Sequence, residues 1–238
     1  MVSAAKLNVE LVVGSVSTGT MDTTTLFNDV VTHYKAKMEI LYTLQEEALK
    51  QPADQQEALG GKLREARGTL VEGIIDVICS KLGIESRVGD NDLQVIRVEA
   101  DGVVHTMEHQ VDRHLYHGGK LIAVVECKAY LDACMYVRAC SDFKRMKKLH
   151  PTIKSFLFAL EDSQAAKAKA FTDVDFDNVC DGIFHMCDGK RSSSKPLYTR
   201  QYAKEIVRAK FEAFVTALKA LLSTEEDELT ATLAAMRV

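Results

Sequence analysis

Three charged residues in the middle of the chain have types and spacing suited to metal-assisted hydrolysis. Asp112 is followed, after thirteen residues, by Glu126 and then Lys128. Residues i and i+2 of a strand project from the same face, so Glu126 and Lys128 are expected side by side, with Cys127 facing the other way. Two convergent carboxylates form a hard-oxygen site for Mg²⁺. A neighbouring lysine can orient a water and stabilise charge on a phosphorane.

A β-hairpin is expected to position these side chains. Leu121–Tyr130 is apolar on both faces, which is typical of a central buried strand. The stretch from Val103 to about His114 is predicted as the preceding strand, and Gly118–Gly119 supplies a turn. If the two strands pair, Asp112 approaches Glu126 at one end of the sheet.

Helices and strands alternate around this hairpin. Hydrophobic periodicity predicts helices over Thr24–Lys50, about 62–82, Ala133–Leu149, Ser163–Phe171, Tyr202–Leu222 and Glu225–Met236, and strands over Leu93–Glu99, Ser155–Leu160 and Gly182–Cys187. Breaks are expected at Gln51–Pro52 and Gly60–Gly61, Asp132 is the expected N-cap of one helix, and Ser223 and Thr224 are expected to open the last. The order predicts an α/β protein with a mixed β-sheet flanked by helices.

The pattern Val111-Asp112, then Glu126-Cys127-Lys128, resembles the motif of the PD-(D/E)XK nuclease superfamily, with Val111 in place of the usual proline. The resemblance covers about residues 62–160 and implies a restriction-endonuclease-like core of order αβββαβ. One domain is expected over 1–238, with an N-terminal helical region at about 22–60 and a C-terminal strand and helices at about 180–238.

The same resemblance implies roles for individual residues. Asp112 and Glu126 are expected to bind Mg²⁺, and Lys128 to position the water and stabilise developing charge. The family often adds a carboxylate from the helix before the sheet, and Glu72 is the matching position. Asp76, one helical turn later, competes for that role.

The length and the distal strand followed by a basic loop look most like a type II restriction endonuclease, which implies a homodimer cutting double-stranded DNA without an organic cofactor. The loop contributes donors for phosphates and guanine edges, namely Lys190, Arg191, Ser192, Ser193 and Lys195. Lys144 lies in a second basic segment, because residues 121–160 hold 7 basic and 3 acidic residues. A solvated loop and a solvated helix face are the alternative interpretations.

The composition of the chain excludes some classes of protein. The chain has 238 residues, of which 47% are hydrophobic and 27% charged, and its net charge of −4 excludes a globally basic nucleic-acid coat. No apolar run approaches the roughly 18 residues that cross a membrane. The N-terminus carries Lys6 and Glu10, so it is interpreted as mature sequence and not as a signal peptide. Six cysteines are too sparse for a disulfide scaffold, which favours the cytoplasm.

Other functions remain open. A nuclease of the same superfamily could act on branched or damaged DNA, and a non-catalytic helical interaction protein could use the Glu126–Lys128 pair for structure alone. Two sets of residues could suggest zinc, namely His105, Glu108, His109, His114 and His117, and Cys180, His185 and Cys187. Their spacing lacks the tight pairs of zinc sites. We therefore expect the histidines in a second shell or on the surface, and the cysteines in the core.

Overall fold

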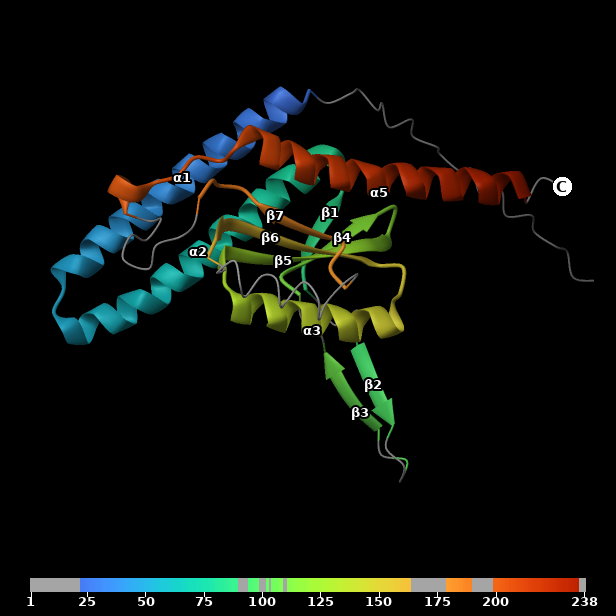
Figure 1. Cartoon of the computed structure of the whole chain (residues 1–238), viewed down its shortest axis with the longest axis horizontal. Coiled ribbons are helices and arrows are strands. Elements are labelled where there is room, and N and C mark those ends of the chain that lie inside the picture. The colour runs from blue at the N-terminus through green and yellow to red at the C-terminus, as the bar shows by residue number, and fades with distance from the viewer. Residues whose placement is uncertain are drawn as a thin grey trace, which may run out of the picture.

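The computed structural model describes residues 22–89, 94–98, 102, 104–108, 111–163, 179–189 and 199–235, and they form a five-stranded sheet with helices on both faces (Figure 1). The strands, in spatial order, are β1 (Glu85–Val88), β4 (Arg113–His117), β5 (Lys120–Leu131), β6 (Lys154–Asp162) and β7 (Gly182–His185). β1, β4 and β5 pair antiparallel, and β5, β6 and β7 pair parallel. The predicted α/β class with a mixed sheet is confirmed.

Two long helices, α1 (Thr23–Lys50) and α2 (Ala53–Leu82), form a packed pair at the start of the described chain. The break expected at Gly60–Gly61 is wrong, because α2 runs through both glycines. Packing against a neighbouring helix supplies most helical stability in proteins, so it outweighs the poor propensity of two glycines. Gly83, with φ of 70°, ends α2 in the left-handed conformation that glycine adopts without strain.

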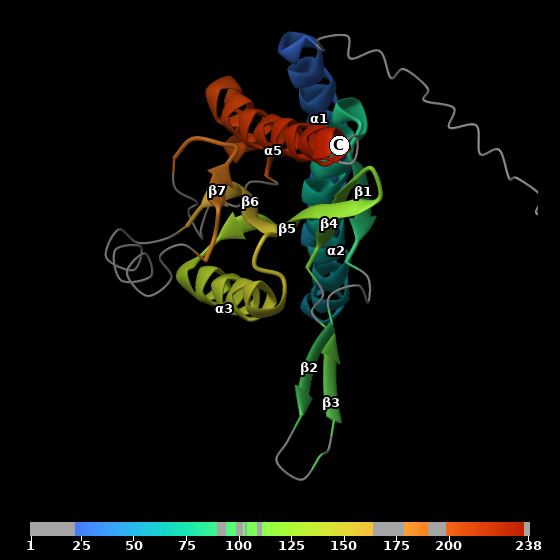
Figure 2. The same ribbon diagram turned by 90° about the vertical axis from the view of Figure 1, so that its right-hand side faces the viewer.

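The sheet separates two hydrophobic cores. Val125 and Cys127 of β5 face the core shared with α1, α2 and α5 (Arg208–Ala235), whereas Val124 faces the core of α3 (Ala133–Leu149). Figure 2 shows α3 across the sheet from α1, α2 and α5. As predicted, Asp132 caps α3, and its Oδ1 accepts a hydrogen bond from the Met135 amide at 2.8 Å. Because successive side chains of a strand point to opposite faces, Glu126 and Lys128 project from the same face of β5 as Val124, which is the face toward α3.

A separate hairpin interrupts the sheet between β1 and β4. Its strands, β2 (Gln94–Val98) and β3 (Val104–Glu108), pair only with each other and project from the body (Figures 1 and 2). The prediction of one strand from Val103 to about His114 is wrong, because that stretch contains β3 and the start of β4. β1 takes the place in the sheet expected for Leu93–Glu99. The core order α2, β1, β4, β5, α3, β6 agrees with the predicted αβββαβ.

The base of this hairpin is a close approach of two backbone segments. A Cβ atom at Gly89 would lie 1.9 Å from the carbonyl oxygen of Val111, so only glycine fits there. Val111 immediately precedes Asp112. The contact therefore fixes the chain just before a predicted site residue.

The C-terminal helices were predicted incorrectly. Arg200–Tyr202 forms a 3₁₀ turn (η1), and one continuous helix, α5, replaces the two that were expected. Ser223 and Thr224 do not open a helix; their hydroxyls donate to the carbonyls of Lys219 and Ala220, one turn earlier in α5, at 3.2 and 3.0 Å. Serine and threonine satisfy their hydroxyls in this way inside helices, so their presence alone does not mark a helix start.

The helix predicted over Ser163–Phe171 lies outside the described residues except for Ser163, whose amide donates to the carbonyl of Leu131 at 2.9 Å.

In the described part of the chain, none of the helices combines the length and the apolar character needed to cross a membrane.

Candidate active site

Asp112 lies at the point where β4 parts from β5. The pairing of β4 with β5 ends at Arg113 and Val125, so beyond this pair the backbone of β4 no longer bonds to β5. The side chain of Asp112 replaces it as the partner of β5, and its Oδ2 accepts a hydrogen bond from the Cys127 amide at 2.7 Å. The carboxylate is therefore held by the backbone of the strand that carries Glu126 and Lys128.

Lys128 connects the two predicted metal ligands. Its Nζ lies 2.6 Å from Glu126 Oε1 and 3.2 Å from Asp112 Oδ2. The structure thus brings together the three residues that the motif singled out. Both carboxylates reach one cationic atom, which is the arrangement expected of a pair able to share a cation.

Partial burial affects the pKa values of Glu126 and Lys128. Burial raises the pKa of the Glu126 carboxyl above its usual value, although Lys128 acts in the opposite direction. For Lys128, burial alone would lower the pKa, but Glu126 and Asp112 outweigh it and the pKa is raised. The ammonium is therefore charged at neutral pH, and the ionised form of Glu126 depends on nearby positive charge.

These donors fit Mg²⁺. Ionised carboxylate oxygens are the ligands that Mg²⁺ prefers, and the ion usually binds through one or two of them while keeping several waters. Among the residues that the structure describes, no three His, Cys, Asp or Glu side chains converge on one point. The fit is thus that of two carboxylates, Asp112 and Glu126, with remaining positions open to water and substrate, and it is unlike a closed structural zinc site.

Arg113 was missed by sequence reasoning, and it organises the acidic residues of α2. Its guanidinium is nearly buried and binds Asp76 in a two-point pair, with Nε to Oδ1 at 2.9 Å and Nη2 to Oδ2 at 3.0 Å. Nη1 lies 2.8 Å from Glu72 Oε2 and also donates to the Asp112 carbonyl at 3.0 Å. One side chain therefore ties α2 to the residue that carries the central carboxylate. A single arginine beside an aspartate gives no signal in a sequence.

Glu72 and Asp76 occupy different positions around Arg113. Glu72 lines the same groove as Asp112 and Lys128. Asp76 uses both oxygens on Arg113, and its Oδ1 also accepts from the Ser86 hydroxyl at 2.7 Å. Of the two carboxylates, Glu72 therefore faces the groove, and both oxygens of Asp76 are taken up by Arg113 and Ser86.

Substitution of these two carboxylates is expected to have different effects. Glu72→Ala should raise the Mg²⁺ concentration required for cleavage about 10–100-fold, as the loss of an outer carboxylate does in metal sites. Asp76→Ala leaves Arg113 short of two charged hydrogen bonds, and should lower the free energy of unfolding by about 2–3 kcal/mol. Mg²⁺ titrations of cleavage and thermal melting measure both, with Glu65→Ala on α2 as control. If only Asp76→Ala impairs cleavage while melting is unchanged, the supporting carboxylate lies one turn later than assigned.

A groove of about 660 Å³ extends from the triad along α2. It passes between α2, the end of α1, the far half of β5 and Met135 at the start of α3. Its polar lining includes Arg64, Arg67, Glu72, Asp112, Lys128 and Tyr130. Asp112 and Glu72 therefore open onto this groove, whereas Glu126 is not among the residues that line it.

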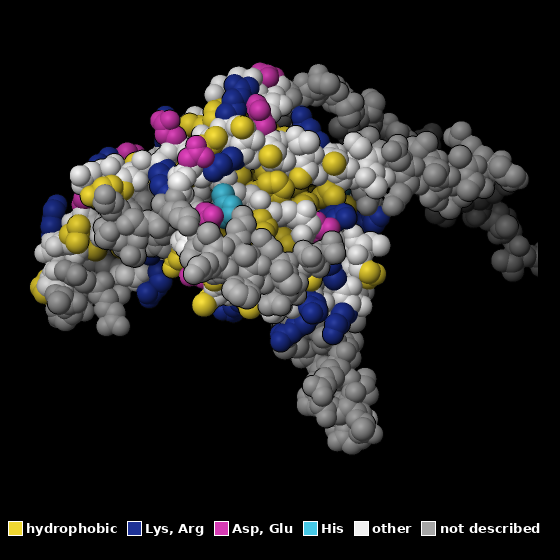
Figure 3. Space-filling view, in the orientation of Figure 1, with side chains coloured by type: hydrophobic (Ala, Val, Ile, Leu, Met, Phe, Trp, Pro, Cys, Tyr) yellow, Lys and Arg dark blue, Asp and Glu magenta, His cyan; other side chains and the backbone are white. Residues whose placement is uncertain are grey.

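The predicted DNA-contacting residues are only partly placed. Lys190, Arg191, Ser192, Ser193 and Lys195 lie outside the described residues. Lys144 is exposed on α3, on the other side of the sheet from α2, and Figure 3 shows basic side chains gathered over that helix. Lys144 is not among the residues that line the groove. The structure does not bring it to the carboxylates.

The residues that could have suggested zinc are also partly placed. His114 is completely buried in β4, so the expectation of a surface position fails for it. Cys187 is buried beside Ile206, and Cys180 is half-buried with its Sγ 3.1 Å from the Gly182 carbonyl oxygen. All six cysteines are free thiols.

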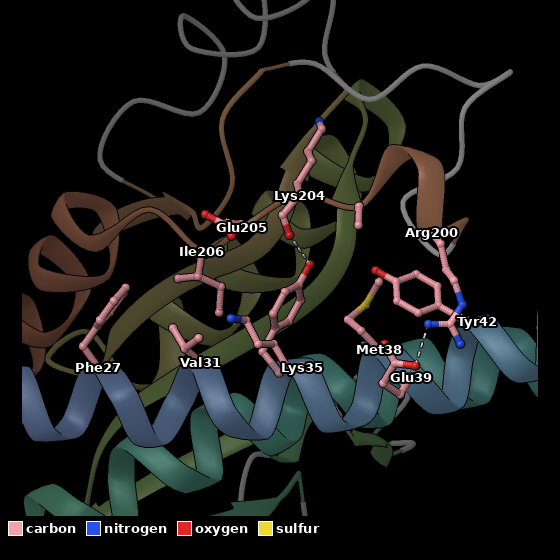
Figure 4. A pocket seen from close by; sticks show the side chains of 12 residues that line it. Phe27, Val31, Lys35, Met38, Glu39, Tyr42, Arg200, Lys204, Glu205 and Ile206 are labelled. Atoms are coloured by element: carbon pink, nitrogen blue, oxygen red, sulfur yellow. Dashed lines mark hydrogen bonds and ion pairs between the residues drawn. The ribbon is translucent and has the colours of Figure 1, made fainter.

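A second cavity lies away from the carboxylates. It has a volume of about 520 Å³ and lies between α1 and the segment 200–206 (Figure 4). Tyr34 donates to the Lys204 carbonyl at 2.8 Å, and Arg200 pairs with Glu39 at 2.7 Å and lies over the ring of Tyr42. These contacts attach the segment to α1, so a structural role accounts for the residues around the cavity.

Known proteins provide independent information on the chain. No family model matches it. The type II restriction enzyme DdeI of Desulfomicrobium norvegicum is 22% identical over an alignment of 221 residues, and the match covers 77% of this chain and 92% of DdeI. A chain of the native BbvCI A2B2 tetramer is similar in structure, with a TM-score of 0.43 and 11% identity over 85% of this chain and 89% of that one. The chain thus shows distant sequence similarity to a type II restriction enzyme, which supports a restriction-endonuclease-like function.

Proposed function

We propose that the protein is a Mg²⁺-dependent type II restriction endonuclease that hydrolyses phosphodiesters at a specific sequence in double-stranded DNA. The observation that carries the proposal is the convergence of Asp112, Glu126 and Lys128 where β4 parts from β5. The motif resembles that of PD-(D/E)XK nucleases. The distant similarity to DdeI extends along most of the chain and supports the same reaction class.

The proposed role of each residue in hydrolysis follows from the chemistry of its side chain. Asp112 and Glu126 would hold Mg²⁺, and the ion would polarise a phosphate oxygen and lower the pKa of a water. Lys128, charged and held between the two carboxylates, orients the attacking water and stabilises the charge that develops on phosphorus. Arg113 holds Glu72 and the Asp112 backbone in place. No organic cofactor is required by this scheme.

The assembly and the recognition elements are part of the proposal. We assign DNA contacts to the loop residues Lys190, Arg191, Ser192, Ser193 and Lys195, and to Lys144. A homodimer with one active site for each DNA strand suits a two-fold symmetric target. Six free cysteines suit a reducing compartment, and we place the protein in the cytoplasm.

Incubation with plasmid DNA tests the proposal. With Mg²⁺ we expect discrete fragments whose sequenced ends share one short sequence, and with EDTA we expect intact plasmid. Cleavage without a shared sequence would contradict the restriction activity but keep the nuclease. Absence of cleavage across several unrelated genomic DNAs would contradict the nuclease itself.

A further inference from the structure

The groove that leads from the carboxylates has opposite charge at its two ends. Glu72 and Asp112 line one end, together with Lys128. Arg67 and Arg64, five and eight residues before Glu72 on α2, line the other end. A polyanion that reaches the carboxylates through a bound cation would meet these arginines farther along the groove. The distribution of charge therefore suits a ligand with several negative groups.

One face of α2 forms a wall of this groove. Gly60, Arg64, Gly68 and Glu72 recur every four residues, and all four line it. At a rise of 1.5 Å per residue, Arg64 lies about 12 Å along the helix from Glu72. That length corresponds to about three or four base-pair steps of B-DNA. The arginines are thus at a suitable distance to contact phosphates a few nucleotides from the scissile bond.

The two arginines differ in how they are held. Arg67 donates through Nε to the Leu63 carbonyl at 3.0 Å, which orients its guanidinium along the helix surface. Arg64 is exposed, and it has no ion-pair partner among the residues that the structure describes. An exposed cation without a carboxylate partner is available to a phosphate.

We infer that Arg64 and Arg67 bind the DNA backbone on one side of the scissile phosphate, so that the groove along α2 is the path of the cleaved strand. The inference rests on the proposed nuclease function and assigns a binding surface to it. It also places phosphate contacts on the helix that carries Glu72, in addition to those proposed for Lys144 on α3.

Two matched pairs of variants on α2 test the inference. Arg64→Ala removes a cation from the groove, whereas Lys62→Ala removes an exposed cation that does not line it. Gly60→Leu adds bulk within the groove, whereas Gly61→Leu adds the same bulk outside it. A Cβ atom at either glycine meets no heavy atom within 4 Å beyond the adjacent helix backbone, so a side chain can begin at either position without a clash. Arg67→Ala provides a second charge deletion.

The measurement is equilibrium binding of a fluorescent mixed-sequence duplex in EDTA at several NaCl concentrations. Arg64→Ala should weaken binding several-fold at low salt, and should reduce the slope of log affinity against log salt by about 0.9. Lys62→Ala should keep the wild-type slope. Gly60→Leu should weaken binding at unchanged or higher melting temperature, and Gly61→Leu should bind like the wild type.

Equal slopes for Arg64→Ala and Lys62→Ala, or equal affinities for Gly60→Leu and Gly61→Leu, overturn the inference. The plasmid assay separates this failure from failure of the nuclease function. If the protein cleaves DNA with Mg²⁺ but Arg64→Ala binds DNA like the wild type, only the proposed DNA contact in the groove is refuted. Binding that depends on Arg64 without any cleavage refutes the nuclease function alone. A wild-type protein that does not bind duplex DNA refutes both.

Discussion

Glu126→Gln is expected to lower the rate of DNA cleavage about a thousand-fold or more, and Asp112→Asn should do the same. Each substitution removes a negative charge and almost no volume from a pair of oxygens that converge on one cation. Single groups aimed at developing charge commonly contribute 10²–10³ in rate, and a ligand that also holds the metal contributes at least as much. Binding of DNA should persist, because less negative charge faces the phosphates.

The two variants should also lose a metal signature that does not depend on cleavage. A ligand that binds only the folded state raises the melting temperature, so Mg²⁺ should stabilise the wild type in a thermal scan. The increase should be smaller or absent in Glu126→Gln and Asp112→Asn. Glu65→Gln, a comparable change on α2 outside the site, serves as control and should behave like the wild type in both assays. Near-normal cleavage by either site variant would contradict the assignment of its carboxylate as a metal ligand.

Lys128→Ala is expected to fold, to bind Mg²⁺ and to lose turnover by about 10²–10³-fold, because only the cation that orients water and stabilises charge is removed. Lys128→Met retains the length of the side chain and separates charge from packing. Lys219→Ala on α5 removes an exposed charge far from the site and should be neutral. Loss of Mg²⁺ binding in Lys128→Ala would show that the lysine holds the carboxylates in place, and its proposed role would then be wrong.

The rate of cleavage by Lys128→Met is expected to depend on pH differently from that of the wild type. Burial raises the pKa of Glu126, and Lys128 lowers it, so removing the ammonium raises it further. Glu126 must be ionised to bind Mg²⁺, and activity is lost as pH falls through its pKa. The acid limb of the rate profile should therefore move to higher pH in Lys128→Met than in the wild type. A limb at unchanged pH would mean that Glu126 does not control it.

The central part of the site could be predicted because its information is local. Glu126 and Lys128 lie two residues apart on a strand whose apolar run is unambiguous, and Asp132 caps the helix that follows at once. Alternation and capping act over a few residues, so their patterns are visible in the sequence.

The missed parts depend on contacts between distant segments. β1 has four mostly exposed residues, so it has no alternation to detect, and it forms a strand only because β4 pairs with it. Arg113 meets Asp76 across 37 residues of sequence, which no periodicity reveals. By contrast, Arg64 lies two four-residue steps before Glu72 on α2, and Arg67 follows Arg64 by one turn. A search for basic residues on that helix face could have found them.

The hairpin between β1 and β4 adds little to the conformational entropy that the chain loses when these two strands pair. Val88 and Arg113 pair across these strands, so the 24 residues between them leave the sheet and return to the same place. Closing a loop of that length, compared with a four-residue turn, costs only about 1–2 kcal/mol, because the penalty grows with the logarithm of length. The sheet can therefore accept insertions of very different size at this position. The point where Gly89 meets Val111 is a natural junction for excising the hairpin or grafting another module in its place.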